Sequence, residues 1–322
     1  MKKYQFLSLC LALLFPAFAH ADTVFTANEA DMSVSSFSWP DFDRVRTISL
    51  DKMPHNISAA PVANVALVTG MGMQKQEDAL LFLNTRESEK AATTSVPVGH
   101  HPAHVVADAA GKTAYVTLSG EDAVAIVDIG LQKAVKEVPV GKYPHGIRIS
   151  ADGKEFYTAN MNDGTVSFVS IADEKETYRL PVGEKPVQIT VLPSTGKIYV
   201  SLNAENAMAV IDTNLRKVIK KIAVGDGPVQ SFAALGKVYV ANQGTRKNPD
   251  HRLFVIDTVT DTVSSVIDVG NGPHGVASST DGSYIFVTNL YDATVSVIDA
   301  KKDTVLKTVQ VGKEPNGITS MP

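Results

Sequence analysis

Histidine is the residue type whose spacing in this chain most clearly indicates chemistry. Six histidines flank a proline that recurs along the sequence and a seventh lies in a longer loop: His55, His100, His101, His104, His145, His274 and, in the loop, His251. Neutral imidazole binds copper, zinc, iron and nickel. Because the six come from neighbouring repeats, they would form an arc around a common axis, and we predict a transition-metal site there.

Other polar residues occupy related positions and are candidate ligand contacts. Gln188, Gln230 and Asn316 follow the same proline in repeats that lack the histidine. Arg148 lies on the first strand of its repeat, where a guanidinium could hold an anion. Nearby loops also contain methionines that offer thioether ligands for Cu(I): Met53, Met71, Met73 and Met161.

The opposing interpretation is structural, because Pro-His-Gly can simply be the way this repeat enters a strand, with partly buried imidazoles bonded to backbone. Three functions therefore stay open. The first is a binding protein that takes a small ligand or a transition metal on its histidine-bearing loops. The second is a metal-assisted hydrolase of lactonase type, for which Glu184, Asp226 and Glu314 are candidate carboxylates. The third is a protein-interaction scaffold without metal.

A repeat positions all these residues. Val-Gly recurs six times between Val98 and Gly312 at intervals of 42, 42, 42, 45 and 42 residues. A fixed period of this size is typical of solenoids and propellers. Each unit holds four short β-rich runs separated by turn signals such as Asp152-Gly153 and Asp281-Gly282. Four antiparallel strands per repeat predict an all-β propeller blade.

The two ends of the chain complete the ring. Residues 22–49 read as the last three strands of a unit, and 311–322 read as its missing first strand. Pairing them closes the ring and removes an exposed sheet edge. We therefore predict a single seven-bladed β-propeller domain over 22–322, whose whole units are 50–97, 98–139, 140–181, 182–223, 224–268 and 269–310.

The strand motifs also carry a family resemblance. The sequences Y-V-T-L at Tyr115, Y-T-A-N at Tyr157, Y-V-A-N at Tyr239 and F-V-T-N at Phe286 resemble those of secreted bacterial YVTN-repeat β-propellers. The resemblance implies the fold and leaves the activity open. Quinone-binding propellers carry a regular tryptophan pattern, and Trp39 is the sole tryptophan here, so no quinone is expected.

Departures from the repeat concentrate on one face. Unit one gains residues around 70–77 and unit five around 245–251, and both insertions fall between the second and third strands. In a propeller these loops lie on the same side as the loops that lead into the innermost strands. The histidines map to that side too, and function commonly lies on the irregular face of a repeat scaffold.

Residues 1–21 read as a secretory signal peptide. Lys2 and Lys3 precede an apolar run that ends in Ala19-His20-Ala21, a signal-peptidase pattern. We expect a periplasmic monomer with no transmembrane segment after cleavage. Cys10, the only cysteine, lies in this leader, which excludes disulfides and thioether-linked haem from the rest.

Composition and missing motifs narrow the partners. Without the leader, 28 basic and 34 acidic residues give a net charge of −6, and nucleic acid is not an expected partner. The sequence has no phosphate loop and no dinucleotide fingerprint, so no nucleotide is expected as cofactor. Haem is not expected either, since the mature chain has no cysteine for a thioether link. The remaining candidates are copper, zinc or iron, a small ligand, or a protein at the histidine-bearing face.

Overall fold

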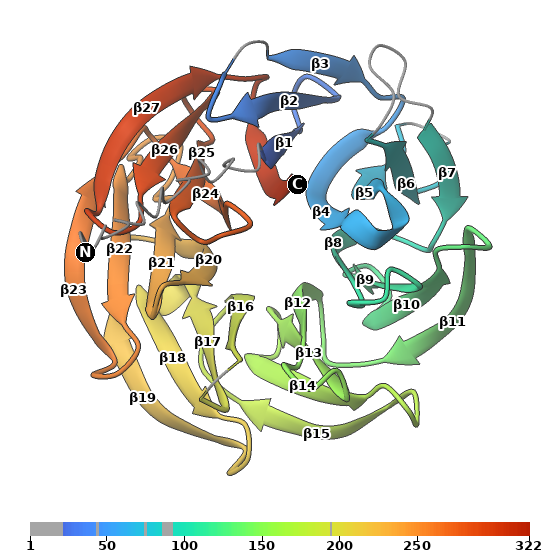
Figure 1. Ribbon diagram of the computed structural model, residues 1–322. Coiled ribbons are helices and arrows are strands. Elements are labelled where there is room, and N and C mark those ends of the chain that lie inside the picture. Colours follow the sequence, from blue (N-terminus) through green and yellow to red (C-terminus); the bar gives the residue numbers. More distant parts are fainter. Residues whose placement is uncertain (1–21, 43–44, 74–75, 86–92, 194) are drawn as a thin grey trace, which may run out of the picture.

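A computed structural model describes residues 22–42, 45–73, 76–85, 93–193 and 195–322. They form seven sheets of four antiparallel strands, arranged in a ring around a central axis (Figure 1). The predicted seven-bladed β-propeller is therefore confirmed. The predicted signal peptide lies outside the described residues. Within those residues, no helix is long and apolar enough to cross a bilayer.

The blades follow the chain in order. Blade 1 contains β4 (Met53–Ala60), β5 (Val65–Met71), β6 (Ala79–Asn84) and β7 (Thr93–Pro97). Blade 2 contains β8 (Pro102–Ala107), β9 (Thr113–Leu118), β10 (Ala123–Asp128) and β11 (Lys133–Pro139). Blade 3 contains β12 (Pro144–Ile149), β13 (Glu155–Asn160), β14 (Thr165–Ser170) and β15 (Lys175–Pro181). Blade 4 contains β16 (Pro186–Leu192), β17 (Lys197–Leu202), β18 (Ala207–Asp212) and β19 (Lys217–Ala223).

The remaining blades complete the ring. Blade 5 contains β20 (Pro228–Ala234), β21 (Lys237–Asn242), β22 (Arg252–Asp257) and β23 (Thr262–Asp268). Blade 6 contains β24 (Pro273–Ser278), β25 (Tyr284–Asn289), β26 (Thr294–Asp299) and β27 (Thr304–Gln310). The closing blade joins β28 (Pro315–Met321) to β1 (Asp22–Asn28), β2 (Ser33–Trp39) and β3 (Arg46–Ser49). Two 3₁₀ turns, η1 (Pro61–Ala63) and η2 (Asn203–Glu205), lie in connecting loops.

The closing blade joins the two ends of the chain, as the repeat register predicts. β28 pairs antiparallel with β1, with Thr26 opposite Ile318 and Ala27 opposite Gly317. The Asp22 carboxylate in turn accepts hydrogen bonds from the backbone N–H and the hydroxyl of Thr280 in blade 6, both at 2.7 Å. Both strand edges at the junction are therefore paired, which removes a site for edge-to-edge aggregation.

Burial falls from the middle of each blade to its rim. The second and third strands are almost wholly buried, whereas the outermost strands β11, β15 and β19 are mostly exposed. Neighbouring sheets pack face to face, so that one cluster joins Leu67 and Phe82 of blade 1 to Val116 of blade 2. The core is thus divided among the blade interfaces. It holds the innermost strands in a rigid ring.

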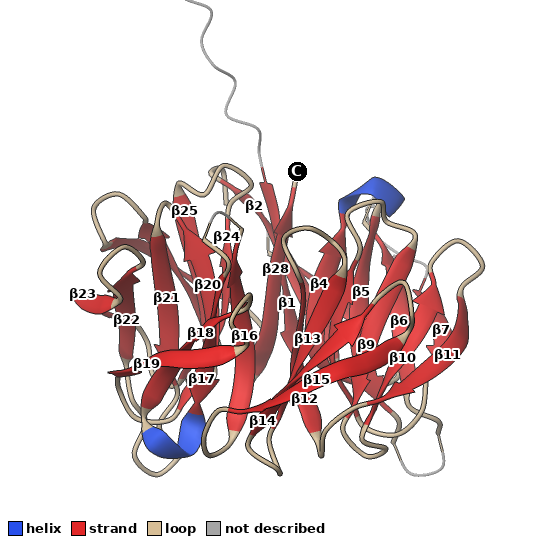
Figure 2. Ribbon diagram, turned by 90° about the horizontal axis from the view of Figure 1, so that it is seen from below, coloured by secondary structure: helices blue, strands red, loops and turns tan. Residues whose placement is uncertain are grey.

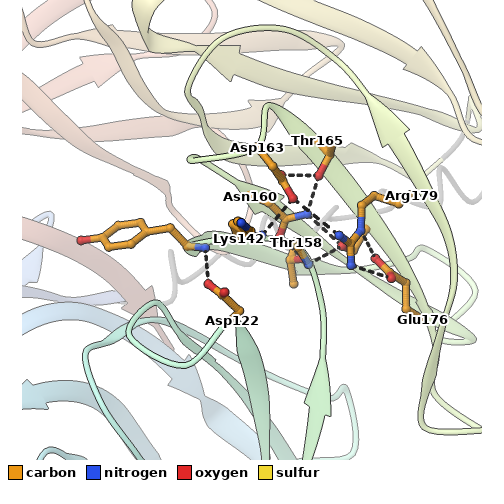
Figure 3. Close-up of polar contacts among 11 residues, drawn as sticks. Asp122, Lys142, Thr158, Asn160, Asp163, Thr165, Glu176 and Arg179 are labelled. Carbon is orange, nitrogen blue, oxygen red and sulfur yellow. Dashed lines mark hydrogen bonds and ion pairs between the residues drawn. The ribbon is translucent and has the colours of Figure 1, made fainter.

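The Val-Gly repeat has a direct packing cause in blade 3, where Figure 3 shows the polar contacts of Asn160. Asn160, at the end of the Y-T-A-N motif, donates to Thr165 Oγ1 at 2.9 Å and Ser167 Oγ at 2.8 Å. A Cβ added at Gly141 would lie only 2.3 Å from Asn160 Nδ2. Glycine is therefore required wherever a motif asparagine packs against the chain leading into the blade. Gly270 with Asn289 and Gly312 with Asn28 repeat the arrangement.

The prediction that insertions fall on one face holds in part. β6 ends at Asn84 and β7 begins at Thr93, so blade 1 is also longer than the other whole blades between its third and fourth strands, on the opposite side. The blade 5 insertion and the β5–β6 connection of blade 1 belong to the predicted side. We name this side the histidine face: it carries the loops that lead into the innermost strands and the loops between second and third strands, and it contains η2 in Figure 2. In blade 1, the Asp78 carboxylate accepts from the backbone N–H groups of Gly72 and His101, both at 2.7 Å. In blade 5, Arg246 pairs with Glu314, and its guanidinium lies 5.0 Å from the ring centre of Tyr291.

Candidate metal centre

A β-bulge follows the proline of every innermost strand. In β12 the register shifts between Pro144 and Ile147, and the other six innermost strands shift at the same place. Bulges re-aim side chains relative to a regular strand. In each blade a polar residue sits in this bulge: His55, His104, His145, Gln188, Gln230, His274 and Asn316. The seven bulges thus hold polar side chains around one axis.

Small residues beside these side chains allow adjacent blades to approach closely. A Cβ on Gly146, which follows His145, would lie 2.4 Å from Gln188 Oε1. A Cβ on Gly275, which follows His274, would lie 2.8 Å from the Asn316 carbonyl oxygen. The Pro-His-Gly sequence is therefore partly structural, as the opposing interpretation held. Glycine lets each bulge contact the next blade.

Three of the seven histidines converge. His55, His104 and His145, from β4, β8 and β12, each offer one ring nitrogen, and these three atoms lie within 4.8 Å of one another. The ring centres of His104 and His145 are 4.5 Å apart, and that of His55 lies 5.9 Å from His104 and 5.4 Å from His145. We call these three residues the histidine triad. Three adjacent blades supply one member each.

One of the three distances within the triad, between His55 and His145, matches metal coordination, and the set as a whole spans up to 4.8 Å. His55 Nε2 and His145 Nε2 are 3.3 Å apart. Zinc binds imidazole nitrogen at about 2.0–2.1 Å, so two ligands of a tetrahedral ion lie roughly 3.3–3.4 Å from each other. The observed distance equals this tetrahedral edge, and a single cation between the two rings could contact both nitrogens without rearrangement.

Hydrogen bonds to the opposite ring nitrogens orient two members of the triad. His145 Nδ1 donates to the Val187 carbonyl oxygen at 3.1 Å, which leaves Nε2 with a free lone pair. His55 Nδ1 lies 3.3 Å from the Glu29 carboxylate and 3.2 Å from Asn316 Nδ2. A proton on Nδ1 pairs with the carboxylate and leaves a lone pair on His55 Nε2. This second-shell pattern is typical of metal-binding histidines.

His104 has a polar atom without a partner. The residue is 1% exposed, and its Nε2 is buried with no hydrogen-bond partner. Gln188 Nε2 lies 3.2 Å from the other ring nitrogen, Nδ1. Orphaned buried polar atoms are rare and costly, and a metal on Nε2 would satisfy this one. Gln188 Oε1 accepts from the Ile189 N–H at 2.9 Å, which holds the amide in this orientation. With Nδ1 accepting, the ring proton lies on Nε2, and metal binding there requires the other tautomer.

Burial keeps the imidazoles of His104 and His145 neutral. Desolvation lowers the pKa of His145 to about 3, with repulsion from His55 as a further cause. Desolvation likewise holds the pKa of His104 well below its ordinary value, and the neighbouring His145 and His55 add to the effect. A neutral imidazole can bind a metal without first releasing a proton. These two rings are therefore ready to bind a cation at neutral pH.

A carboxylate from the closing blade supports His55. Glu29 directly follows β1, and Asn316 Nδ2 donates to its carboxylate. Burial opposes the charge, but hydrogen bonds and the His55 ring prevail, and the pKa of Glu29 is lowered. Sequence reasoning missed Glu29. The only signal was its position directly after Phe25-Thr26-Ala27-Asn28, the motif that belongs to the split blade.

His274 lies beside this network but not in the triad. Its Nδ1 donates to the Asn316 carbonyl oxygen at 2.9 Å, and desolvation lowers its pKa to about 4. Asn316 Oδ1 is buried without a partner, and Gln230 Nε2 is 3.5 Å from the Asn316 carbonyl oxygen. The predicted contact residues Gln188, Gln230 and Asn316 thus line the same region, where Gln188 and Asn316 contact histidine rings.

The remaining predicted ligands lie elsewhere on the histidine face. His100 is exposed, and the His101 ring lies 5.6 Å from that of Tyr143. The side chain of His251 is 55% exposed and lies 3.7 Å from Asp268. The structure therefore gathers three of the seven predicted ligands into one cluster. Arg148 lies further along the channel, as described below.

The methionines and loop carboxylates show no described contact with the triad. Met161 packs against the core of blades 4–6 and Met73 is exposed, while Met53 and Met71 face each other across β4 and β5. The carboxylates considered for hydrolysis, Glu184 and Asp226, are exposed on loops, and Glu314 pairs with Arg246. The three imidazoles are thus the metal ligands that the described residues bring together.

Comparisons with known proteins identify the fold alone. No protein-family model matches the chain, and no curated protein matches it in sequence. Among solved structures, a functionally unknown protein from Desulfotomaculum acetoxidans has a TM-score of 0.74 at 15% identity, covering 92% of this chain and 98% of its own. The chain thus belongs to the class of seven-bladed β-propellers, and its YVTN-repeat resemblance stays a prediction.

Two further structures are similar in the same way. Hydrazine synthase from Kuenenia stuttgartiensis has a TM-score of 0.70 at 18% identity, covering 83% of this chain and 89% of its own. Apo AztD from Citrobacter koseri has a TM-score of 0.67 at 15% identity, covering 94% of this chain and 98% of its own. At such identities the likeness concerns architecture, so function has to be argued from the site.

Proposed function

We propose that the protein is a periplasmic metal-binding protein whose histidine triad takes one divalent transition-metal ion in the channel mouth. The observation that carries the proposal is the convergence of His55, His104 and His145 to within 4.8 Å. The orphaned Nε2 of His104 and the carboxylate behind His55 support it. The hydrogen bond from His145 Nδ1 to the Val187 carbonyl oxygen, which leaves a lone pair on His145 Nε2, supports it too.

The ligand set favours Zn²⁺ or Cu²⁺. Three neutral imidazoles without a thiolate suit both ions, and Cu²⁺ binds nitrogen ligands more tightly than Zn²⁺. A tetrahedral ion on three histidines retains a fourth position for water or a ligand. Binding of metal to the folded state alone would also stabilise the fold in proportion to the logarithm of free metal concentration.

The test is metal titration of untagged protein. The chain would be purified without a histidine tag, treated with a chelator, and titrated with Zn²⁺ and Cu²⁺ while bound metal is measured by mass spectrometry. We expect one ion per chain and a rise in melting temperature. In His145→Gln, which removes one ligand, we expect affinity to fall by at least tenfold.

His251→Gln is the matched control, because His251 is an exposed histidine on the same face. It should retain wild-type stoichiometry and affinity. The proposal fails if the wild type takes up no stoichiometric metal. It also fails if His145→Gln binds as tightly as the control, since the triad would then not be the site.

A further inference from the structure

A cavity lies in the central channel beyond the triad. Its volume is about 150 Å³, and six of the seven innermost strands line it. One water needs roughly 10–15 Å³ measured in this way. The cavity therefore has room for a small organic molecule together with water.

Arg148 is the charged residue in the wall of this cavity. Its described hydrogen bond runs from Nη1 to the Ile147 carbonyl oxygen at 2.9 Å, and none of the described ion pairs includes it. Desolvation lowers the pKa of Arg148 to about 10, and no carboxylate opposes the shift. A guanidinium removed from water is costly unless an anion pairs with it. The Arg148 guanidinium therefore stays charged at neutral pH, and no anionic partner is described for it.

The other arginines show what a structural role looks like in this fold. Arg216 pairs with Glu155 at 2.8 Å, and its guanidinium lies 4.7 Å from the ring centre of Phe168. Arg252 pairs with Asp250 at 2.6 Å. Arg148 has neither an acid nor an aromatic ring among its described contacts. The fold therefore supplies counter-charges where arginine is structural, and supplies none in the channel.

The rest of the lining combines hydrogen-bond donors with apolar walls. Thr319 Oγ1 accepts from the Ala59 N–H at 3.1 Å, which leaves its hydroxyl proton free to donate. Asn56 Oδ1 accepts from the Val105 N–H at 3.4 Å, which leaves its amide hydrogens as donors. Phe232 and Val276 contribute apolar surface. A positive charge, several hydrogen-bond donors and apolar walls together suit an organic anion.

We propose that the channel cavity binds a small organic carboxylate. Its carboxylate group pairs with the guanidinium of Arg148, and its carbon chain lies against Phe232 and Val276. The planar guanidinium matches a carboxylate through two parallel hydrogen bonds. The apolar walls distinguish this ligand from inorganic phosphate. The proposal does not require the metal site, because Arg148 lines the cavity and is not a ligand of the triad, although its charge reaches His104.

The test is calorimetric titration of the chelator-treated protein with acetate, propionate and butyrate, and with inorganic phosphate for comparison. We expect saturable binding of the carboxylates that tightens by about fourfold for each added methylene, since each buried methylene favours binding. Phosphate should bind more weakly than butyrate. Arg148→Gln should abolish carboxylate binding, and Arg148→Lys, which keeps the charge but loses the paired hydrogen bonds, should weaken it at least tenfold.

Arg216→Gln is the matched control. It should lower the melting temperature, because it breaks an ion pair, and leave butyrate affinity unchanged. Arg148→Gln should keep or raise the melting temperature of the ligand-free protein, an outcome that a structural arginine would not give. If Arg148→Gln does not fold, Arg148→Lys decides. The proposal is wrong if no carboxylate binds, if Arg148→Lys binds as the wild type does, or if phosphate binds as tightly as butyrate.

Discussion

At the scale of single residues, the triad depends on what stands behind it. Val187 fixes the ring of His145 through its backbone oxygen, whereas His55 is oriented by a side chain, the Glu29 carboxylate. Glu29 lies 3.3 Å from His55 Nδ1, on the side opposite to the proposed metal. A carboxylate in this place raises the basicity of the imidazole and holds its tautomer.

Replacement of Glu29 by glutamine should therefore weaken metal binding without removing a ligand. We predict that Glu29→Gln lowers the affinity for Zn²⁺ by about 10-fold to 100-fold, the effect typical of second-shell carboxylates. The measurement is competition titration against a coloured zinc chelator. Stoichiometry should remain one ion per chain at saturating metal.

Glu314→Gln provides the comparison, because Glu314 lies on the same face and pairs with Arg246 instead of a histidine. Its zinc affinity should equal that of the wild type. Equal affinities in Glu29→Gln and Glu314→Gln would show that Glu29 does not orient His55. The metal site itself could then still stand on its three imidazoles.

At the scale of elements, the repeat motif and the bulge have different roles: the motif packs the blades, and the bulge orients the polar side chains of the site. The Val-Gly glycine packs against the end of the second-strand motif, against an asparagine as Gly141 and Asn160 do in blade 3, or against a leucine as Gly99 and Leu118 do in blade 2. The bulge after the proline then turns a polar side chain out of the strand's regular alternation. The first device recurs with little change, and the second carries the variation among histidine, glutamine and asparagine.

Substitution of the repeat glycine tests this packing. Gly141→Ala should destabilise the fold by about 1–3 kcal/mol, because the new Cβ would overlap with Asn160 Nδ2 at 2.3 Å and force the blade to shift. The free energy of unfolding would be measured in urea. Gly130→Ala is the control, since its nearest neighbour would be 3.5 Å away; similar losses in both variants would refute the packing explanation.

These elements also explain how far the sequence could be interpreted. The seven blades and their closure were predictable because the Val-Gly glycine packs closely against the second-strand motif in successive blades, so the glycine recurs at a fixed interval. The triad was not, because histidines occur in two phases: His55 and His145 directly follow their prolines, whereas His104 is two residues past Pro102. Which histidines converge depends on the direction in which each bulge orients its side chain. That direction cannot be read from the spacing of residues in the sequence.

At the scale of the whole molecule, ring closure and the candidate site are coupled. Glu29 follows β1 and Asn316 lies in β28, so the two ends of the chain jointly support His55 of blade 1. Blades 2 and 3 supply the other two members of the triad. The site is therefore complete only when the closing blade has formed, and the histidines are buried in this way only in the closed propeller.

This coupling predicts how global stability depends on pH in the metal-free protein. The folded pKa values of His145 and His274 are about 3 and about 4, both below the unfolded value of about 6.5. Above that value the two rings are neutral in both states and contribute nothing. As the pH falls below it, the two histidines bind protons in the unfolded chain but stay neutral in the folded protein. The free energy of unfolding therefore declines toward pH 4.

Each buried histidine should steepen this decline by up to about 1.4 kcal/mol for every pH unit. Urea denaturation between pH 7 and 4.5 would measure the slope, and His274→Gln should make it shallower while preserving a donor toward the Asn316 carbonyl oxygen. His251→Gln, an exposed position, should leave it unchanged. A wild-type stability that stays flat over this range would mean that the imidazoles are protonated within the closed ring. The triad would then repel a cation at acidic pH instead of binding it as neutral ligands.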